Sequence, residues 1–150
     1  MKRLTASFRL LTSTFAMSLA AVPAWAQSAP APAQGAVLSL ELNAAQPSEK
    51  GCRLTFVVNN ALGADLSKAA FEIALFNEAG VVDRLTVLDF KDLPAGKTKV
   101  TRFDLAGADC GKLSRVLINS ATECAGNGVE PAACMRGLKT STKTGIAFGV

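Results

Sequence analysis

The residues of this sequence that could do chemistry are its four cysteines, because the chain contains no histidine and no tyrosine. An even number of cysteines in an exported chain indicates disulfides. The rival is a four-thiolate metal site, which usually shows two close Cys-x-x-Cys pairs. The spacings here fit that pattern poorly, so we expect two disulfides and no metal or other cofactor. The four residues are Cys52, Cys110, Cys124 and Cys134.

Carboxylates are the remaining candidates for catalysis, because the missing histidine removes every Ser-His-Asp or Cys-His arrangement. Asp83, Asp89 and Asp92 lie close together in the sequence, and a catalytic carboxylate pair is one interpretation. Solvated acids on turns and strand ends are the far more common one. The sequence shows neither the calcium-loop spacing nor a phosphate loop. We therefore expect no catalytic, cofactor-binding or metal-binding residue.

A short basic group follows these acids and consists of Lys97, Lys99 and Arg102. One interpretation is a stripe that faces a ligand. The other is that these residues guard the edge of a sheet, since Lys and Arg at such positions oppose pairing with other chains. The sequence leaves both interpretations open.

The first 26 residues have the pattern of a signal peptide. A basic start is followed by the apolar run Leu10–Val22 and by Ala24-Trp25-Ala26, which predicts cleavage before Gln27. The apolar run is shorter than the roughly 20 residues of a membrane span, and Pro23 breaks it. We expect a bacterial protein that is periplasmic or secreted, with no stable membrane insertion after cleavage.

Cleavage would change the charge of the chain. The signal contains three of the 16 Lys and Arg residues (Lys2, Arg3 and Arg9), which leaves 13 against 12 Asp and Glu, a net charge of +1. A nucleic-acid partner requires a concentrated basic face. We therefore expect no nucleic-acid partner.

The organisation expected for the mature chain is an Ala/Pro-rich linker over residues 27–35 and one domain over residues 36–150. The clearest element is Cys52–Asn60, where Cys52, Leu54 and Phe56 alternate with polar residues, as in a central β-strand. The predicted strands are 36–43 (an edge strand), 52–60, 70–76, 81–88, 98–105, 113–119 and 138–150.

Two places are ambiguous. Residues 65–79 have helical spacing and propensity, but the turn at Asn77–Gly80 and the β-branched stretch after it favour a strand from Ala70 to Phe76. A short helical turn at 66–69 stays open. The alternation slips between Val100 and Phe103, which predicts a β-bulge there.

About seven strands separated by short turns predict an immunoglobulin-like antiparallel β-sandwich. Cys52 opens the second predicted strand and Cys110 precedes the sixth, and these two strands run in the same direction in a meander or Greek key. Both cysteines then lie at the same end, so we expect a Cys52–Cys110 bridge. Cys124–Cys134 would close the long loop predicted over residues 120–137.

The segments Cys-Arg-Leu-Thr-Phe-Val-Val-Asn-Asn (from Cys52), Leu-Thr-Val-Leu-Asp-Phe (from Leu85) and Arg-Val-Leu-Ile-Asn (from Arg115) resemble a family of small exported bacterial proteins. These are usually labelled only "Tat pathway signal sequence domain protein". The resemblance covers residues 36–135 and implies export without any catalytic motif. The chain departs from the label because it has no Arg-Arg pair.

With no catalytic set, we expect a non-enzymatic accessory or protein-interaction domain whose partner is an unidentified periplasmic protein. Edge strands, end loops, or the loop between Ser120 and Gly137 would form the contact. That loop could instead be a stapled cover over one end of the sandwich. The alternatives are a small-ligand or glycan-binding module and, more remotely, a carboxylate-based hydrolase. A flat surface with one exposed apolar strand would favour the protein partner.

Overall fold

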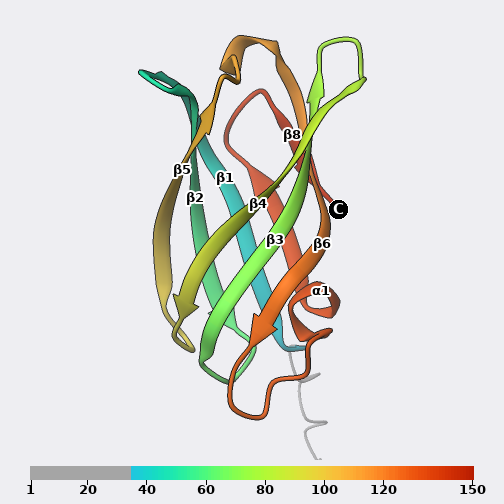
Figure 1. The fold of residues 1–150 in the computed structure, drawn as a ribbon. Coiled ribbons are helices and arrows are strands. Elements are labelled where there is room, and N and C mark those ends of the chain that lie inside the picture. The colour runs from blue at the N-terminus through green and yellow to red at the C-terminus, as the bar shows by residue number, and fades with distance from the viewer. Residues whose placement is uncertain (1–34) are drawn as a thin grey trace, which may run out of the picture. The chain divides into compact units, whose positions relative to one another are not determined.

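The computed structural model describes residues 35–150, which form two four-stranded β-sheets (Figure 1). Sheet 1 has the strand order β5-β2-β1-β7, and sheet 2 has the order β4-β3-β6-β8. The predicted signal peptide and the linker up to residue 34 lie outside the described residues. The strands are β1 (Val37–Ser48), β2 (Gly51–Ala61), β3 (Leu66–Asn77), β4 (Val82–Leu93), β5 (Thr98–Ala106), β6 (Leu113–Ala125), β7 (Leu138–Thr142) and β8 (Ala147–Gly149); the helices are η1 (Cys110–Lys112) and α1 (Ala133–Arg136).

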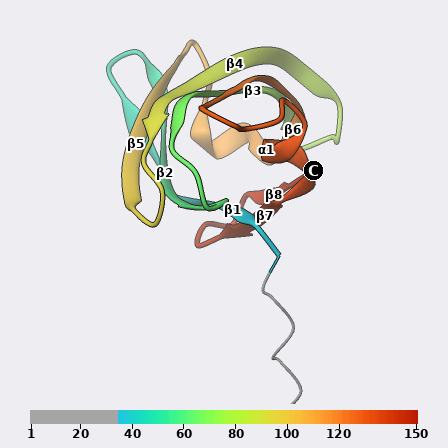
Figure 2. The ribbon, with the colours of Figure 1, turned by 90° about the horizontal axis from the view of Figure 1, so that it is seen from below.

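The two sheets pack face to face, which confirms the immunoglobulin-like β-sandwich (Figure 2). Neighbouring strands are antiparallel except for the pairs β1–β7 and β6–β8, which are parallel. No helix among residues 35–150 is long and apolar enough to cross a membrane.

Strand β2 is central, as predicted, and its inward side chains form the middle of the core. Leu54 and Val58 are fully buried, and Phe56 is 1% exposed. The Phe56 ring meets the rings of Phe90 and Phe103 edge-on, with centroids 5.6 and 6.0 Å apart. Aromatic rings of both sheets thus fill the interior at this level.

Strand β3 begins at Leu66, so the helical turn left open at 66–69 is wrong. The strand pairs with β4 on one side and with β6 on the other. Those two rows of hydrogen bonds, together with burial on both faces, outweigh the helix propensity of its Ala, Leu and Glu residues.

Two details of sheet 1 also differ from expectation. The first strand is not an edge strand, because β7 pairs with it from Leu38↔Leu138 to Leu42↔Thr142. Strand β5 contains no bulge, since its register with β2 is unbroken. The backbone alternates regularly, but the residue types do not follow it: Val100 faces solvent and is 58% exposed, whereas the polar Thr101 points inward.

The C-terminal region differs from its prediction in two ways. Strand β6 continues to Ala125, so residues 120–125 are not loop. The single last strand predicted over 138–150 is two strands, β7 in sheet 1 and β8 in sheet 2. Thr142 and Thr144 make the turn between them, because their hydroxyls accept the backbone N–H groups of Thr144 and Ile146.

Both expected disulfides are present, and the structure places Cys52–Cys110 at the start of β2 and Cys124–Cys134 between β6 and α1. The first bridge ties the start of β2 to η1, the short helix that leads into β6, so the two cysteines lie at the same end, as the shared strand direction predicted. The second bridge ties α1 to the end of β6.

Candidate functional site

The four outer edges of the two sheets differ in how well they are protected. β7 spans five residues and β8 three, too short to offer a long pairing surface. β5 carries Lys99, Arg102 and Asp104 within nine residues. β4 is twelve residues long and is the edge of sheet 2. Among residues 35–150, β4 is therefore the long edge without a central charge, which is the kind of edge that proteins usually block.

Three of the exposed side chains of β4 are large and apolar. Val82, Leu85 and Val87 are 49, 56 and 51% exposed, whereas Leu88 and Phe90, which point inward, are buried. This exposed row lies beside the outer face of β3. β4 thus combines an unpaired edge with an apolar outer face.

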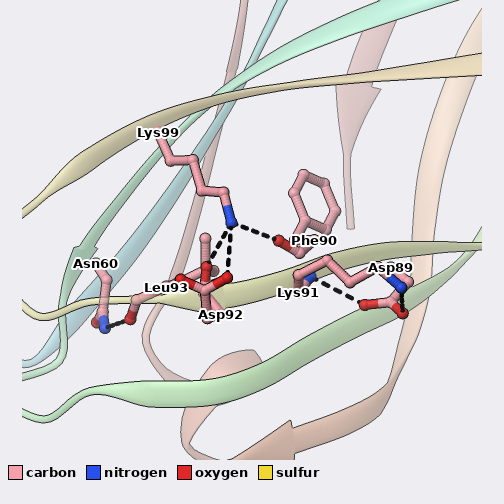
Figure 3. A network of polar contacts seen from close by, with 7 residues as sticks. All are labelled: Asn60, Asp89, Phe90, Lys91, Asp92, Leu93 and Lys99. Atoms are coloured by element: carbon pink, nitrogen blue, oxygen red, sulfur yellow. Dashed lines mark hydrogen bonds and ion pairs between the residues drawn. The ribbon is translucent and has the colours of Figure 1, made fainter.

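Lys99 of β5 caps one end of this edge (Figure 3). Its ammonium donates to the carbonyl oxygens of Phe90 at 3.3 Å and Asp92 at 2.8 Å, and it lies 3.2 Å from the Asp92 carboxylate. The Phe90 carbonyl therefore points away from β3. The backbone groups of Thr86 and Leu88 face β3, because they lie opposite Ile73 and Phe71, which alternate with Asn77, and the Asn77 N–H bonds the Val81 carbonyl oxygen across the β3–β4 hairpin. Leu85, Val87 and Asp89 therefore present their N–H and C=O groups to the free edge.

Arg84 joins β4 to β5 at the other end. Its guanidinium donates to the Ala106 carbonyl oxygen at 2.7 Å and pairs with Asp83 at 2.8 Å. Between these two links, residues Leu85–Asp89 have an unpaired backbone edge. We call Leu85–Asp89 the open segment of β4.

β-Bulges lie at both ends of the open segment. The register with β3 shifts between Val82 and Arg84 and again between Asp89 and Lys91. Lys91 has a left-handed backbone (φ 63°), which Asp89 supports by accepting from the Lys91 N–H at 2.9 Å. An added strand could therefore keep a regular register only along the open segment.

The three aspartates singled out from the sequence do not form a pair. Each lies beside its own cation: Asp83 beside Arg84, Asp89 beside Lys91 and Asp92 beside Lys99. Asp83 and Asp92 lie near opposite ends of β4, roughly 30 Å apart along the strand. Hydrogen bonds from Lys91 and Lys99 hold the pKa values of Asp89 and Asp92 below the usual range. A general acid needs the opposite shift.

The basic group does not form a stripe on one face. Lys99 points inward and bonds β4, Arg102 follows it on an exposed position, and Lys97 lies in the turn before β5. This placement supports the interpretation as an edge guard. In the described part of the chain no three His, Cys, Asp or Glu side chains come together as metal ligands.

The long loop predicted after residue 120 is reduced to residues 126–132 and α1. Val129, Ala133 and Met135 pack against the core, and Leu38 N–H donates to the Gly137 carbonyl oxygen at 2.9 Å. These contacts support the interpretation as a stapled cover over one end of the sandwich.

Sequence reasoning did not single out the edge of β4. The alternation of Leu85 and Val87 was visible within the predicted strand 81–88, but the sequence does not show which strands have one neighbour and which have two. Comparison with protein-family models, curated proteins and solved structures found no significant match to this chain.

Proposed function

We propose that this protein is an exported, non-enzymatic accessory domain that binds an extended segment of another exported protein along the edge of β4. The observation that supports this most is the contrast between edges: β5 has a charged residue at its centre, β7 and β8 are short, and β4 is long with the uncharged centre Leu85–Leu88. A long edge with an uncharged, apolar centre is a surface on which another strand can pair.

Strand addition would use the backbone and the side chains of the open segment together. Leu85, Val87 and Asp89 offer N–H and C=O groups on the free side of β4, which give affinity without demanding a particular sequence. Leu85 and Val87 offer apolar contact to alternate side chains of the incoming strand. Lys99 and Arg84 limit the length of that strand, because they link β4 to β5 at both ends.

Export would place the domain where such a partner occurs. The predicted signal peptide directs the chain to the periplasm or the outside, and the two disulfides fit an oxidising compartment.

The test is affinity capture from the exported fraction of the native bacterium with three matched baits. Val87→Lys adds a charge to the open segment, and Val100→Lys adds the same charge to an equally exposed valine on β5. We expect a partner that wild type and Val100→Lys retain and Val87→Lys loses. A fourth bait, Val87→Pro, which removes an N–H group from the free edge, should also lose it.

The proposal fails if no protein is retained by wild type, or if Val87→Lys and Val87→Pro retain the same protein as wild type. Circular dichroism of each bait shows that a loss of binding does not come from unfolding.

A further inference from the structure

The open segment of β4 ends at a carboxylate that lies on its apolar face. Asp89 and Val87 both line a surface hollow of about 320 Å³ whose floor is Ala70. Lys68 and Glu123, which pair with each other, form its far wall. Any strand added along β4 must therefore place a side chain beside Asp89 as well as beside Val87.

A second copy of this chain fits the open segment poorly. In a twofold-symmetric antiparallel pair, one residue must face itself, and the registers that use the open segment are centred on Thr86 or on Val87. The first sets Asp89 opposite Asp83 of the second copy. The second sets Asp89 opposite Leu85. Like charges directly opposite each other, or a carboxylate against leucine, destabilise a cross-strand pair.

A register centred on Leu85 is no better, because its outer pairs would involve the bulged residues around Asp83. Asp89 therefore protects this edge from self-association while leaving it open to other strands. Inward or flanking charges perform this role in natural sheets.

A partner strand with a basic residue opposite Asp89 would instead form a favourable cross-strand charge pair. Its cation would lie beside the Asp89 carboxylate, on the side of β4 away from β3, and its next outward residues would face Val87 and Leu85. In an antiparallel strand these apolar residues come two and four positions after the basic one. Lys91 already pairs with Asp89, but the Asp89 side chain is still 29% exposed, so part of its carboxylate stays open.

We propose that Asp89 is the specificity-determining residue of the β4 edge: it excludes a second copy of this chain and selects a strand of the pattern basic-x-apolar-x-apolar. This inference rests on the proposed function and adds to it the chemistry of the partner segment.

Sedimentation velocity over a wide concentration range tests the first half. We expect wild type to stay monomeric and Asp89→Val to dimerise with increasing concentration, and we expect Val87→Pro added to Asp89→Val to abolish this dimerisation. Glu130→Val is the control, since it removes an equally charged, cation-paired carboxylate away from any sheet edge. Asp89→Asn keeps an acceptor for the Lys91 N–H and replaces Asp89→Val if the latter does not fold. A wild-type protein that dimerises, or an Asp89→Val variant that stays monomeric at every concentration, would show that Asp89 does not exclude a second copy.

Two capped hexapeptides test the second half: Lys-Thr-Val-Thr-Val-Thr and the same peptide with Glu in place of Lys. Titrated into labelled protein and followed by amide NMR, the Lys peptide should bind about fivefold more tightly, as expected for a cross-strand charge pair. Asp89→Lys should reverse the preference.

Equal binding of the two peptides in wild type would overturn the selection by charge while leaving strand addition in place. Captured partners that ignore Val87→Lys would instead overturn the proposed function itself. The two failures are therefore distinguishable.

Discussion

Removing the two disulfides one at a time should destabilise the domain by different amounts. Cys52–Cys110 spans 58 residues and Cys124–Cys134 spans 10. In the chain-entropy model the long loop contributes about 4.2 kcal/mol and the short one about 1.6 kcal/mol less, the difference being 1.5RT ln(58/10) at 25 °C.

The packing loss should nearly cancel in this comparison. Each bridge contains one completely buried sulfur residue, Cys52 in the first and Cys134 in the second, and one residue that is less buried. The matched variants are Cys52→Ala with Cys110→Ala, and Cys124→Ala with Cys134→Ala. The difference in unfolding free energy between them therefore reports mainly the loop length.

Equilibrium urea unfolding of the mature chain is the assay, with both the midpoint and the m-value fitted. Loss of the long bridge should also raise the m-value more, because a freer denatured chain exposes more surface. Equal destabilisation by the two double variants, or a larger loss from the short loop, would show that strain or packing and not loop closure sets the contribution of these bridges.

Three further outcomes follow from the polar contacts. Asn60→Ala should lower the unfolding free energy by about 3 kcal/mol, because the buried Asn60 side chain donates to the carbonyl oxygens of Ala64 and Leu93 and accepts from the Leu62 N–H. Urea unfolding measures this loss. The control Asn59→Ala removes one exposed hydrogen bond and should cost less than about 1 kcal/mol. Asp89, Asp92 and Asp104 have lowered pKa values because of hydrogen bonds from Lys91, Lys99 and Arg53, so the stability they contribute is present above the unfolded pKa and is lost as the pH falls through the folded one. The urea midpoint should therefore fall below about pH 4, and less steeply in Asp92→Asn; a flat midpoint down to about pH 2 would contradict this. Lys99→Met should speed amide hydrogen exchange around Phe90–Leu93, since it frees the carbonyls that Lys99 caps, whereas exchange in Lys97→Met should match wild type.

Much of the fold could be predicted because its evidence is local. The alternation through Leu54, Phe56 and Val58 predicts which side chains point inward, and these residues are buried in the structure. The even number of cysteines in a chain with a signal peptide predicts disulfides, and the shared direction of two strands predicts one bridge. Each of these inferences needs only the period of a strand or a count of residues.

The errors fall where distant segments decide the outcome. Residues 66–69 form a strand because β4 and β6 flank them, although their own propensity is mixed. The first strand is internal because β7, about 100 residues later, pairs along it. Residues 138–150 divide between two sheets because the threonine turn at Thr142–Thr144 reverses the chain.

By itself, the sequence determined that these segments are strands, which face of each is apolar, and that two sulfur bridges close the domain. Only the tertiary structure decided that β4 lies at an edge, that Lys99 turns inward to cap it, and that Asp89 ends its open segment. The reason is that a two-residue period specifies which way a side chain faces but not which strand lies beside it, and neighbours are chosen by packing across the whole domain.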